Sequence, residues 1–498
     1  MTDTGTLRTP PASSTVRATP ATAVIASVVL VELSSGITQG FLSPMLKGLT
    51  ETLRVTAADL NWISIANLLS SVAFTPVLSR MGDLYGHRRI LRWNLAIVLL
   101  GSVLVGLSRS FGVLLTGQIL QGAFAGFFPL LVGILRNRAT ATTPEADVRA
   151  GAGRDTGDGE SRRGISFMVA ALVAGLALGL VASGFVASTV DSPTAALWVP
   201  TAAVGLALAV TWPLLPESTH RPGGRIDWAG GMLLCLGLVA IMLGLGMGGL
   251  PGWEWGSART LGCLIGGVVV TALWALVELR TAEPMIDVRM FRHRNVVTVS
   301  LVTLTFSFCM LGLQVANPVF LGTDSTQHGY GLGLDPFAIA LAMLPNLLAL
   351  ALGALAAPAV ARAVSDRLTL LAGSLLMAAG YLVSLSWHTS MLPFLAGTAV
   401  AGVGIGFLQH STRTLAVESV PRDRTSVGSG INELLINVGG SLGAAAVLTV
   451  FTTRTPAGAV LPELGAYTTS WTICVAVSLA GAAIALFHRT LKNTEART

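Results

Sequence analysis

Two carboxylic acids lie inside long apolar stretches of the sequence, where an ionisable side chain is costly. Glu32 stands about ten residues into the apolar run 22–46, which at 1.5 Å per residue places it ~15 Å deep, near the middle of a bilayer. Glu433 lies about two turns into the run 426–452, and Asn437 follows four residues later on the same helical face. Because ionisable residues inside a membrane are usually functional, Glu32 and Glu433 are candidates for coupling the binding and release of a proton to substrate movement.

Each of these carboxyls has a second interpretation. Glu32 could instead form a hydrogen bond to a neighbouring helix, and Glu433 could simply face cytoplasmic water. Side-chain amides inside the apolar runs are likewise open to two interpretations: they could line a polar cavity or join one helix to the next. These amides are Gln39, Gln118, Gln121 and Asn437.

Two further patterns concern how helices meet and turn. Gly175 and Gly179 are four residues apart, a spacing that allows two membrane helices to approach closely. A short basic segment follows residue 79 and contains Asp83, Gly86, Arg88 and Arg89. Gly86 permits a tight turn, and Asp83 can accept hydrogen bonds from the start of a neighbouring helix or from an arginine.

The elements that carry these residues are predicted to be membrane-spanning helices. Of the 498 residues, 52% are hydrophobic and only 11% are charged, whereas an ordinary soluble domain has about 25% charged residues. With a mean hydropathy of +0.71, the chain needs lipid to cover much of its surface. The apolar runs are too long for barrel strands and lack a period of two, so the predicted fold class is an all-α polytopic membrane protein.

The predicted spans fall into groups of six, two and six. They cover residues 22–46, 59–80, 90–108, 112–135, 165–188 and 194–215, then 227–248 and 260–280, then 295–322, 336–361, 368–387, 391–411, 426–452 and 469–488. This grouping predicts two six-helix bundles around a central cavity, with two extra helices between the bundles. The short basic turns 80–92 and 362–367 each contain an aspartate at matching places, a weak internal repeat of the kind found in alternating-access transporters.

The basic residues predict the orientation. If the N-terminus is cytoplasmic, 26 of the 31 arginines and lysines fall in cytoplasmic segments, which include the loop 412–424. This asymmetry is the positive-inside pattern of a multi-pass protein in a cell membrane, inner or plasma, with both termini in the cytoplasm. The basic residues assigned to the outer side are Lys47, Arg54, Arg109, Arg259 and Arg454.

The domain boundaries follow from the same pattern. We expect a disordered cytoplasmic tail over 1–21, a first bundle over 22–215, two linking helices over 216–294, a second bundle over 295–488 and a tail over 489–498. The polar, glycine-rich segment 137–164 is predicted to be a disordered cytoplasmic insertion in the first bundle.

Composition and motifs also exclude several classes of function. The net charge of +6 reflects the cytoplasmic loops, so no nucleic-acid partner is expected. Four isolated cysteines in apolar runs predict neither a disulfide framework nor a metal site. The sequence contains no zinc-protease, hydrolase-elbow or nucleotide-binding motif, so no cofactor and no enzyme activity are expected. A membrane enzyme or a receptor built on a transporter fold stays open as an alternative.

The segment 79–91 resembles the signature loop of the major facilitator superfamily, G-x-x-x-D-R-x-G-R-R. Asp83, Gly86 and Arg88 match this pattern and Arg89 supplies a further base, whereas Ser79, Leu84 and His87 depart from it. The resemblance covers nearly the whole chain and is greatest to the branch of fourteen-span drug:proton antiporters. It also includes the segments around Asp227 and from Glu278 to Arg292, and the glycine patterns 402–406 and 429–443. The resemblance implies the major facilitator fold and a loop that latches the two bundles in the outward-facing state.

Two departures from the family pattern concern residues associated with proton coupling. The family usually has an arginine where this chain has Gln118, and a proline where this chain has Leu180. The resemblance nevertheless implies a secondary-active exporter of hydrophobic or amphiphilic small molecules, such as drugs or antibiotics, which works by proton antiport and alternating access. The alternative is an exporter or facilitator of one specific metabolite, such as an endogenous antibiotic, without proton coupling. Besides the small-molecule substrate, the expected partners are the proton and the lipid bilayer.

Overall fold

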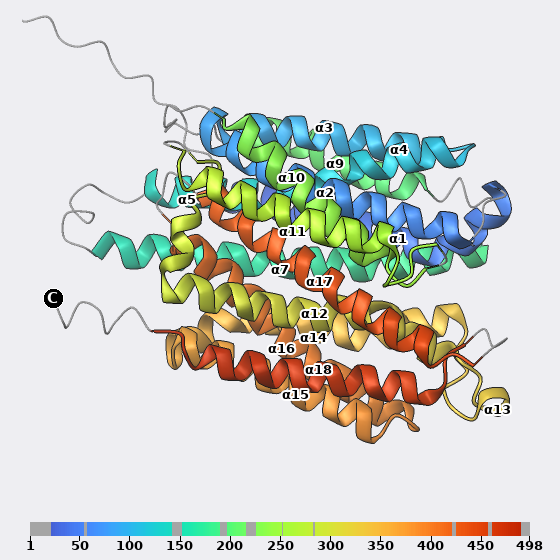
Figure 1. Ribbon diagram of the computed structural model, residues 1–498. Helices are drawn as coiled ribbons and strands as arrows, with labels where there is room; N and C mark the ends of the chain where they lie inside the picture. Colours follow the sequence, from blue (N-terminus) through green and yellow to red (C-terminus); the bar gives the residue numbers. More distant parts are fainter. Residues whose placement is uncertain are drawn as a thin grey trace, which may run out of the picture.

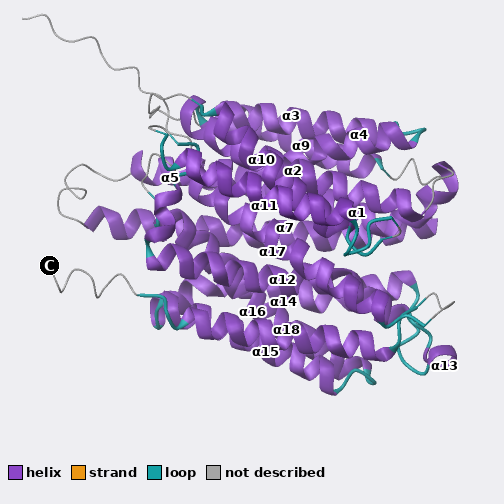
Figure 2. Ribbon diagram, viewed as in Figure 1, coloured by secondary structure: helices purple, strands orange, loops and turns teal. Residues whose placement is uncertain are grey.

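The computed structural model is built from long helices that run roughly side by side (Figure 1). Among the described residues the only other regular feature is one isolated bridge between Leu250 and Trp253, and Figure 2 shows helices joined by short loops. The described residues are 21–53, 57–141, 152–189, 197–215, 226–250, 252–281, 284–420, 425–456 and 461–489.

Six rods form the first bundle. They are α1 (Ala21–Leu53), α2 (Ala57–Tyr85), α3 (His87–Gly106), a broken rod of α4 (Phe111–Gln121), η1 (Gly122–Gly126) and α5 (Phe127–Ala141), then α7 (Ala152–Thr189) and α9 (Trp198–Leu214). The short 3₁₀ stretch η1 interrupts the fourth rod at a glycine- and alanine-rich segment.

Two linking helices, α10 (Trp228–Met247) and α11 (Ala258–Glu278), pack mainly on each other, and α10 also contacts α2 and α17. After η2 (Val288–Arg292) comes the second bundle of α12 (Arg294–Gly322), α14 (Pro336–Ala363), α15 (Asp366–Ser386), α16 (Met391–Glu418), α17 (Thr425–Thr453) and α18 (Leu464–Ala485). The four-residue helix α13 (Ser325–His328) lies between α12 and α14. Several of these helices begin at a side-chain cap: Asp227 for α10, Ser257 for α11 and Asp335 for α14.

The all-helical membrane fold is confirmed. Among the described residues, twelve helical rods are long and apolar enough to cross a membrane. The other two predicted spans are the helix α2, whose buried side chains include Ser70, Ser71 and Thr75, and the shorter apolar helix α9. The six, two and six grouping therefore reappears as two bundles with a helical pair between them.

The bundles meet through a symmetric pair of contacts. The second helix of the first bundle, α2, packs on the fifth of the second, α17, and the fifth of the first, α7, packs on the second of the second, α14. In Figure 1 the first bundle occupies the upper part and the second bundle the lower part. This reciprocal packing of second and fifth helices is the arrangement expected of two related halves that rock against each other.

One end of the molecule, at the left in Figure 1, gathers the turn at Gly86, the turn between Ala363 and Asp366, and the starts of α12 and α17. We refer to it as the basic end, because the arginine-rich segments 80–92, 280–294 and 362–367 belong to it.

The segment 137–164 differs from its prediction. The described parts of this segment are helical, since α5 continues to Ala141 and α7 begins at Ala152. A helical end that extends beyond the bundle satisfies its backbone internally, so polarity and glycine content alone did not end the helix. Residues 142–151, most of the predicted tail 1–21 and the segment 490–498 lie outside the described residues.

Candidate functional site

Three ionisable side chains, Glu32, Arg413 and Glu433, lie in the interior of the molecule. Glu32 on α1 is 2% exposed, and its Oε1 atom has no hydrogen-bond partner among the described residues. Across the interface, Arg413 on α16 donates from Nε to Glu433 Oε1 at 2.7 Å and from Nη2 to Glu433 Oε2 at 3.2 Å. Glu32 lies within electrostatic range of both Glu433 and Arg413. Of the two predicted carboxyls, Glu433 is therefore paired with a cation, whereas Glu32 is buried with one oxygen unpartnered among the described residues.

The position of Arg413 corrects the sequence analysis, which assigned it to the cytoplasmic loop 412–424. Arg413 is 3% exposed and lies inside α16, which continues to Glu418. Its guanidinium also donates to Gln409 and stacks 4.5 Å from the ring centroid of Phe128 on α5. The sequence pattern that could have indicated a place inside the helix is the i, i+4 spacing of Gln409 and Arg413, which puts both side chains on one helical face.

Polar side chains continue along these faces away from the basic end. Gln39 lies two turns beyond Glu32 on α1, is exposed, and donates to Ser35 at 3.0 Å. Asn437, one turn beyond Glu433, is half-buried, and Gln314 on α12, which the sequence analysis missed, is exposed. Exposed amides in the middle of apolar helices are typical of a surface that faces water or a polar ligand rather than lipid.

The amides of Gln118 and Gln121 lie elsewhere. Both are 4% exposed; Gln118 donates to Gln121 at 2.8 Å, and Gln121 donates to Ser102 on α3 at 2.9 Å. Asn67 on α2 donates to the backbone carbonyl of Gln118 at 3.0 Å. These side chains join three helices of the first bundle, which is the second of the two interpretations given above.

Gly175 and Gly179 bring α7 against α1, the helix that carries Glu32. A Cβ atom at Gly175 would lie 2.3 Å from the carbonyl oxygen of Leu33, and one at Gly179 would lie 2.5 Å from that of Ile37. Only glycine permits this approach, and the contact fixes α1 immediately beside Glu32.

At the basic end, Asp83 connects the first bundle to the start of α17. Its carboxylate accepts from the backbone N–H groups of Ser426 and Val427, each at 3.2 Å, and the residue is 4% exposed. His87, which replaces an arginine of the family pattern, shares Nε2 with Asp83 at 3.0 Å and with Ser426 Oγ at 2.7 Å. Gly86 has a φ of 100°, which glycine tolerates and which lets α2 end and α3 begin within one residue.

The two arginines of the predicted latch point to other partners. Arg88 donates to the carbonyl of Trp212 at 3.3 Å, at the end of α9 in its own bundle, and Arg89 is exposed. Of the four latch residues predicted from the sequence, Asp83 makes the contact with α17 and Gly86 forms the turn beside it. His87 takes part as well, although the sequence analysis treated it only as a departure from the pattern.

A second connection at the basic end is made by arginine side chains of the first bundle. Arg162 on α7 donates to Asp366 at 2.8 and 3.2 Å and to Glu418 at 2.7 Å through two nitrogens. Arg136 on α5 adds a 2.6 Å bond to the carbonyl of Val417. Together with Asp83, these contacts hold the basic ends of the bundles closed.

The linking helices carry an acidic pair at the same end. Glu278 is 2% exposed and accepts from Trp274 at 3.2 Å and from the backbone of Met285 at 3.1 Å. A Cβ atom at Gly230 would lie within 3.0 Å of oxygens of both Glu278 and Asp227. The two carboxyls therefore face each other where α10 begins and α11 ends.

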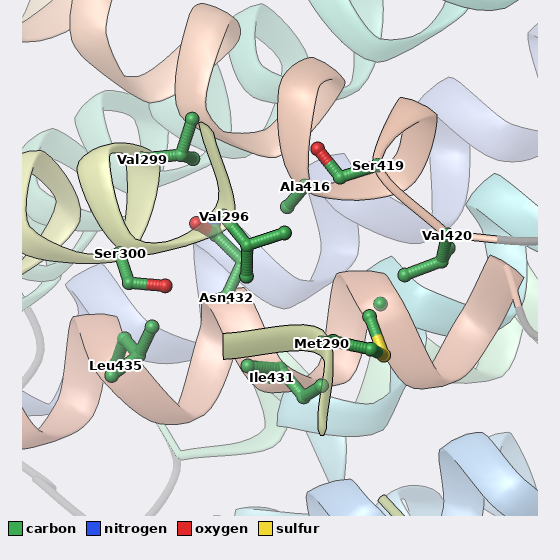
Figure 3. A pocket seen from close by; sticks show the side chains of 11 residues that line it. Met290, Val296, Val299, Ser300, Ala416, Ser419, Val420, Ile431, Asn432 and Leu435 are labelled. Atoms are coloured by element: carbon green, nitrogen blue, oxygen red, sulfur yellow. The ribbon is translucent and has the colours of Figure 1, made fainter. Parts of the chain in front are cut away.

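A small cavity lies between α12, α16, α17 and η2 (Figure 3). Its volume is about 20 Å³, which is enough for about one water. Asn432 borders it, accepts from Thr303 at 2.9 Å, and has an Nδ2 atom without a partner among the described residues. This cavity is too small for a cargo molecule and contains none of the predicted site residues.

The fold is that of a polytopic helical membrane protein with two six-helix bundles and a buried ion pair in its interior. The sequence model of the Major Facilitator Superfamily matches residues 28–444, and the chain belongs to this family. Its relatives include the tetracenomycin C resistance and export protein of Streptomyces glaucescens, 26% identical, with 89% of this chain and 77% of the relative covered. Another is the multidrug resistance protein Stp of Mycobacterium tuberculosis (strain CDC 1551 / Oshkosh), 26% identical, with 78% and 67% covered.

Two solved structures share the fold. The human organic anion transporter MFSD10 (TETRAN) superposes with a TM-score of 0.65 at 14% identity, covering 94% of this chain and 99% of that one. A point mutant of the nucleoside transporter NupG gives 0.56 at 11% identity, covering 94% and 100%. The family and these neighbours point to a transporter of small molecules rather than to an enzyme.

Proposed function

We propose that the chain exports hydrophobic or amphiphilic small molecules by alternating access, and that inward movement of protons drives the export. The observation that carries the proposal is the buried Oε1 of Glu32, which has no partner among the described residues, in a chain whose other predicted carboxyl, Glu433, is paired with Arg413. A carboxyl in the interior can hold a proton when it faces one side of the membrane and release it when it faces the other. A membrane potential supplies about 2.3 kcal/mol per charge per 100 mV to such a step.

The proposed orientation puts the basic end in the cytoplasm of a cell that carries the protein in its inner or plasma membrane, with both termini inside. The bonds of Asp83 and Arg162 then close the cytoplasmic side, so this conformation corresponds to the outward-facing state. The exposed Gln39 and Gln314, with Asn437, are the proposed polar lining of the cargo path. The bundles 22–215 and 295–488 are the proposed moving bodies, and 216–294 links them.

The names of the relatives support export and suggest a probe. One relative is named for export of tetracenomycin C and another for multidrug resistance. Tetracenomycin C and a panel of unrelated hydrophobic drugs are therefore the first compounds to test in inverted membrane vesicles, in which a cytoplasmic site faces the outside. We expect an imposed pH gradient, acidic inside, to drive accumulation of at least one compound, and Glu32→Gln to abolish that accumulation.

Asn94→Ala is a matched control, because Asn94 is fully buried in the same bundle but lies on α3. It should leave gradient-driven accumulation in place. If no compound accumulates under the gradient, or if Glu32→Gln transports as well as the parent chain, proton-coupled export by this site is wrong.

The second candidate function is uncoupled export of one specific metabolite. The relative named for a single antibiotic favours it, and so do Gln118 and Leu180 at places where the antiporter pattern has arginine and proline. Resistance of cells to one compound only, unchanged when the pH gradient is collapsed, would select this candidate. Resistance to several unrelated compounds that disappears with the gradient would select proton-coupled multidrug export.

A further inference from the structure

The guanidinium of Arg413 is held in place on all sides. Two of its nitrogens bind the two carboxylate oxygens of Glu433, and Nη1 donates to Gln409. Gln409 in turn donates to the sulfur of Met310 at 3.2 Å, and Phe128 covers the guanidinium face from the other bundle. A planar cation fixed in this way matches a carboxylate through two parallel bonds, which is the strongest arrangement for such a pair.

The two carboxyls near Arg413 are consequently not equivalent. Glu433 has both oxygens paired with a cation, whereas Glu32 is buried with Oε1 unpartnered among the described residues. Ionising a buried carboxyl is costly unless it is paired. With Glu32 protonated and Glu433 ionised, the three side chains together carry no net charge.

Other charged groups on the helices around α1 do not compensate Glu32. The described charged side chains of α2, α5 and α7 belong to the basic end of these helices. Asp83 bonds there to the start of α17, Arg136 to Val417, and Arg162 to Asp366 and Glu418. The others at this end are Arg80, Arg138 and Arg163. The helix α9, which also packs on α1, has no charged residue.

We propose that Arg413 is a positioning residue that keeps Glu433 ionised and thereby leaves Glu32 as the carboxyl that carries the proton, one per transport cycle. This inference rests on the proposed proton-coupled export. In each cycle a proton from outside water binds the Glu32 carboxylate and later leaves from the same carboxyl to cytoplasmic water. Glu433 stays paired and takes no proton.

Infrared difference spectra of the purified full chain, taken between acidic and alkaline buffer, report protonated carboxyls directly and need no cargo. We expect the parent chain to show a buried carboxyl signal that Glu32→Gln removes. Arg413→Gln should add a second signal of similar size. The double variant Arg413→Gln/Glu433→Gln should lose that second signal, and Arg413→Lys should not gain it, because lysine retains the charge.

Absence of a second carboxyl signal in folded Arg413→Gln would overturn the inference. The double variant has no unpaired charge at this position, so we expect it to fold even if Arg413→Gln alone does not. Its infrared spectrum should still contain the Glu32 signal. If that signal is missing from the double variant, Glu32 does not hold its proton independently of the pair, and the inference is wrong.

Transport separates this inference from the proposed function. With a compound that the vesicle assay has shown to be carried, the parent chain should move one proton per molecule, and Arg413→Gln should raise that ratio toward two. Two protons per molecule in the parent chain would overturn the inference while export stands. Spectra as predicted, but no gradient-driven transport of any compound, would leave the proton assignment intact and overturn proton-coupled export.

Discussion

Asp83, near the end of α2, and Asp366, the first residue of α15, occupy matching places in the two halves, yet they hold the opposite half in different ways. Asp83 is buried and accepts from two backbone N–H groups at the start of α17. Asp366, at the start of α15, reaches α7 only through the side chain of Arg162, and its own side chain is 23% exposed. One connection is therefore a carboxylate at a helix N-terminus, and the other is an ion-pair network near water.

This difference predicts unequal contributions to closure. Backbone donors have fixed positions, and a buried carboxylate that loses them retains its full desolvation cost. Partly exposed ion pairs are weakened by water and salt, and each contributes about 1 kcal/mol or less. Closure of the basic end should thus depend mainly on Asp83 and His87, with Arg162 as a smaller, salt-sensitive addition.

Opening of the basic end can be measured by the rate at which a single cysteine at position 79 is labelled. Ser79 is 1% exposed, and a Cβ atom at Gly430 on α17 would lie 2.4 Å from its hydroxyl oxygen. A thiol at this position can react with a maleimide only when α2 and α17 separate. The probe is Ser79→Cys in a background whose four native cysteines are replaced by alanine, once that background has been shown to fold and transport.

The largest effect is expected for Asp83→Ala. This change leaves the N–H groups of Ser426 and Val427 without their acceptor and removes the partner of His87. The free energy that favours the closed state should fall by about 2–4 kcal/mol. Because about 1.4 kcal/mol corresponds to a factor of ten, labelling at position 79 should become tenfold faster or more. Asp83→Asn, whose amide oxygen can still accept, should fall between Asp83→Ala and the parent chain. Equal labelling of all three proteins would contradict a dominant role for Asp83.

His87→Arg is expected to come second, although it restores the residue of the family pattern. The imidazole is enclosed: a Cβ atom at Gly133 would lie 2.2 Å from its Nε2, and Asn137 lies 3.2 Å from its Nδ1. A longer side chain must leave this space and lose the 2.7 Å bond to Ser426. Overpacking typically costs about 1–3 kcal/mol, so labelling should rise about fivefold and the melting temperature should fall. A variant that closes more tightly than the parent would show that His87 is merely a tolerated substitute.

The helices and the turn containing Asp83 could be predicted because their signals are local. Apolar runs of membrane-crossing length, charge asymmetry and Gly86 all act within about twenty residues of sequence. The roles of His87 and Arg413 could not be predicted in the same way. His87 binds Ser426, which is 339 residues away, and Arg413 became informative only once its partner Glu433 and the covering Phe128 were known.

For Gln118 and Gln121 as well, the sequence could not identify the partners of the side chains. A buried amide in an apolar run predicts a polar partner, but not whether that partner is a cargo or a neighbouring helix. Here the partners are Ser102 and Asn67. Arg162 was similarly assigned to a polar insertion, because its partners Asp366 and Glu418 come from distant segments.

Arg162→Gln is expected to have a moderate effect that depends on salt. The substitution removes the contacts to both Asp366 and Glu418, whose side chains are 23% and 16% exposed. Labelling at position 79 should rise about threefold at low ionic strength, and the difference from the parent chain should shrink as salt screens the parent's own pairs. Asp83→Ala serves as the comparison, because its effect should persist at high salt. A salt-independent effect of Arg162→Gln would mean that the two connections are of one kind.

The smallest effect is expected for Asp366→Asn. Arg162 keeps its two bonds to Glu418, at 2.7 Å each, and the new amide oxygen can still accept from the guanidinium. The helix α15 retains its cap, because Ser365 accepts from the N–H of Leu368, so only one favourable charge near the helix start is lost. Such a charge contributes about 0.3–1 kcal/mol. Because the amide retains a bond to Arg162, we expect the lower end of this range, which is roughly a twofold change in labelling. If Asp366→Asn opened the basic end as far as Asp83→Ala does, the two turns would be equivalent latches despite their different partners, and the asymmetry between the halves would have no consequence for closure.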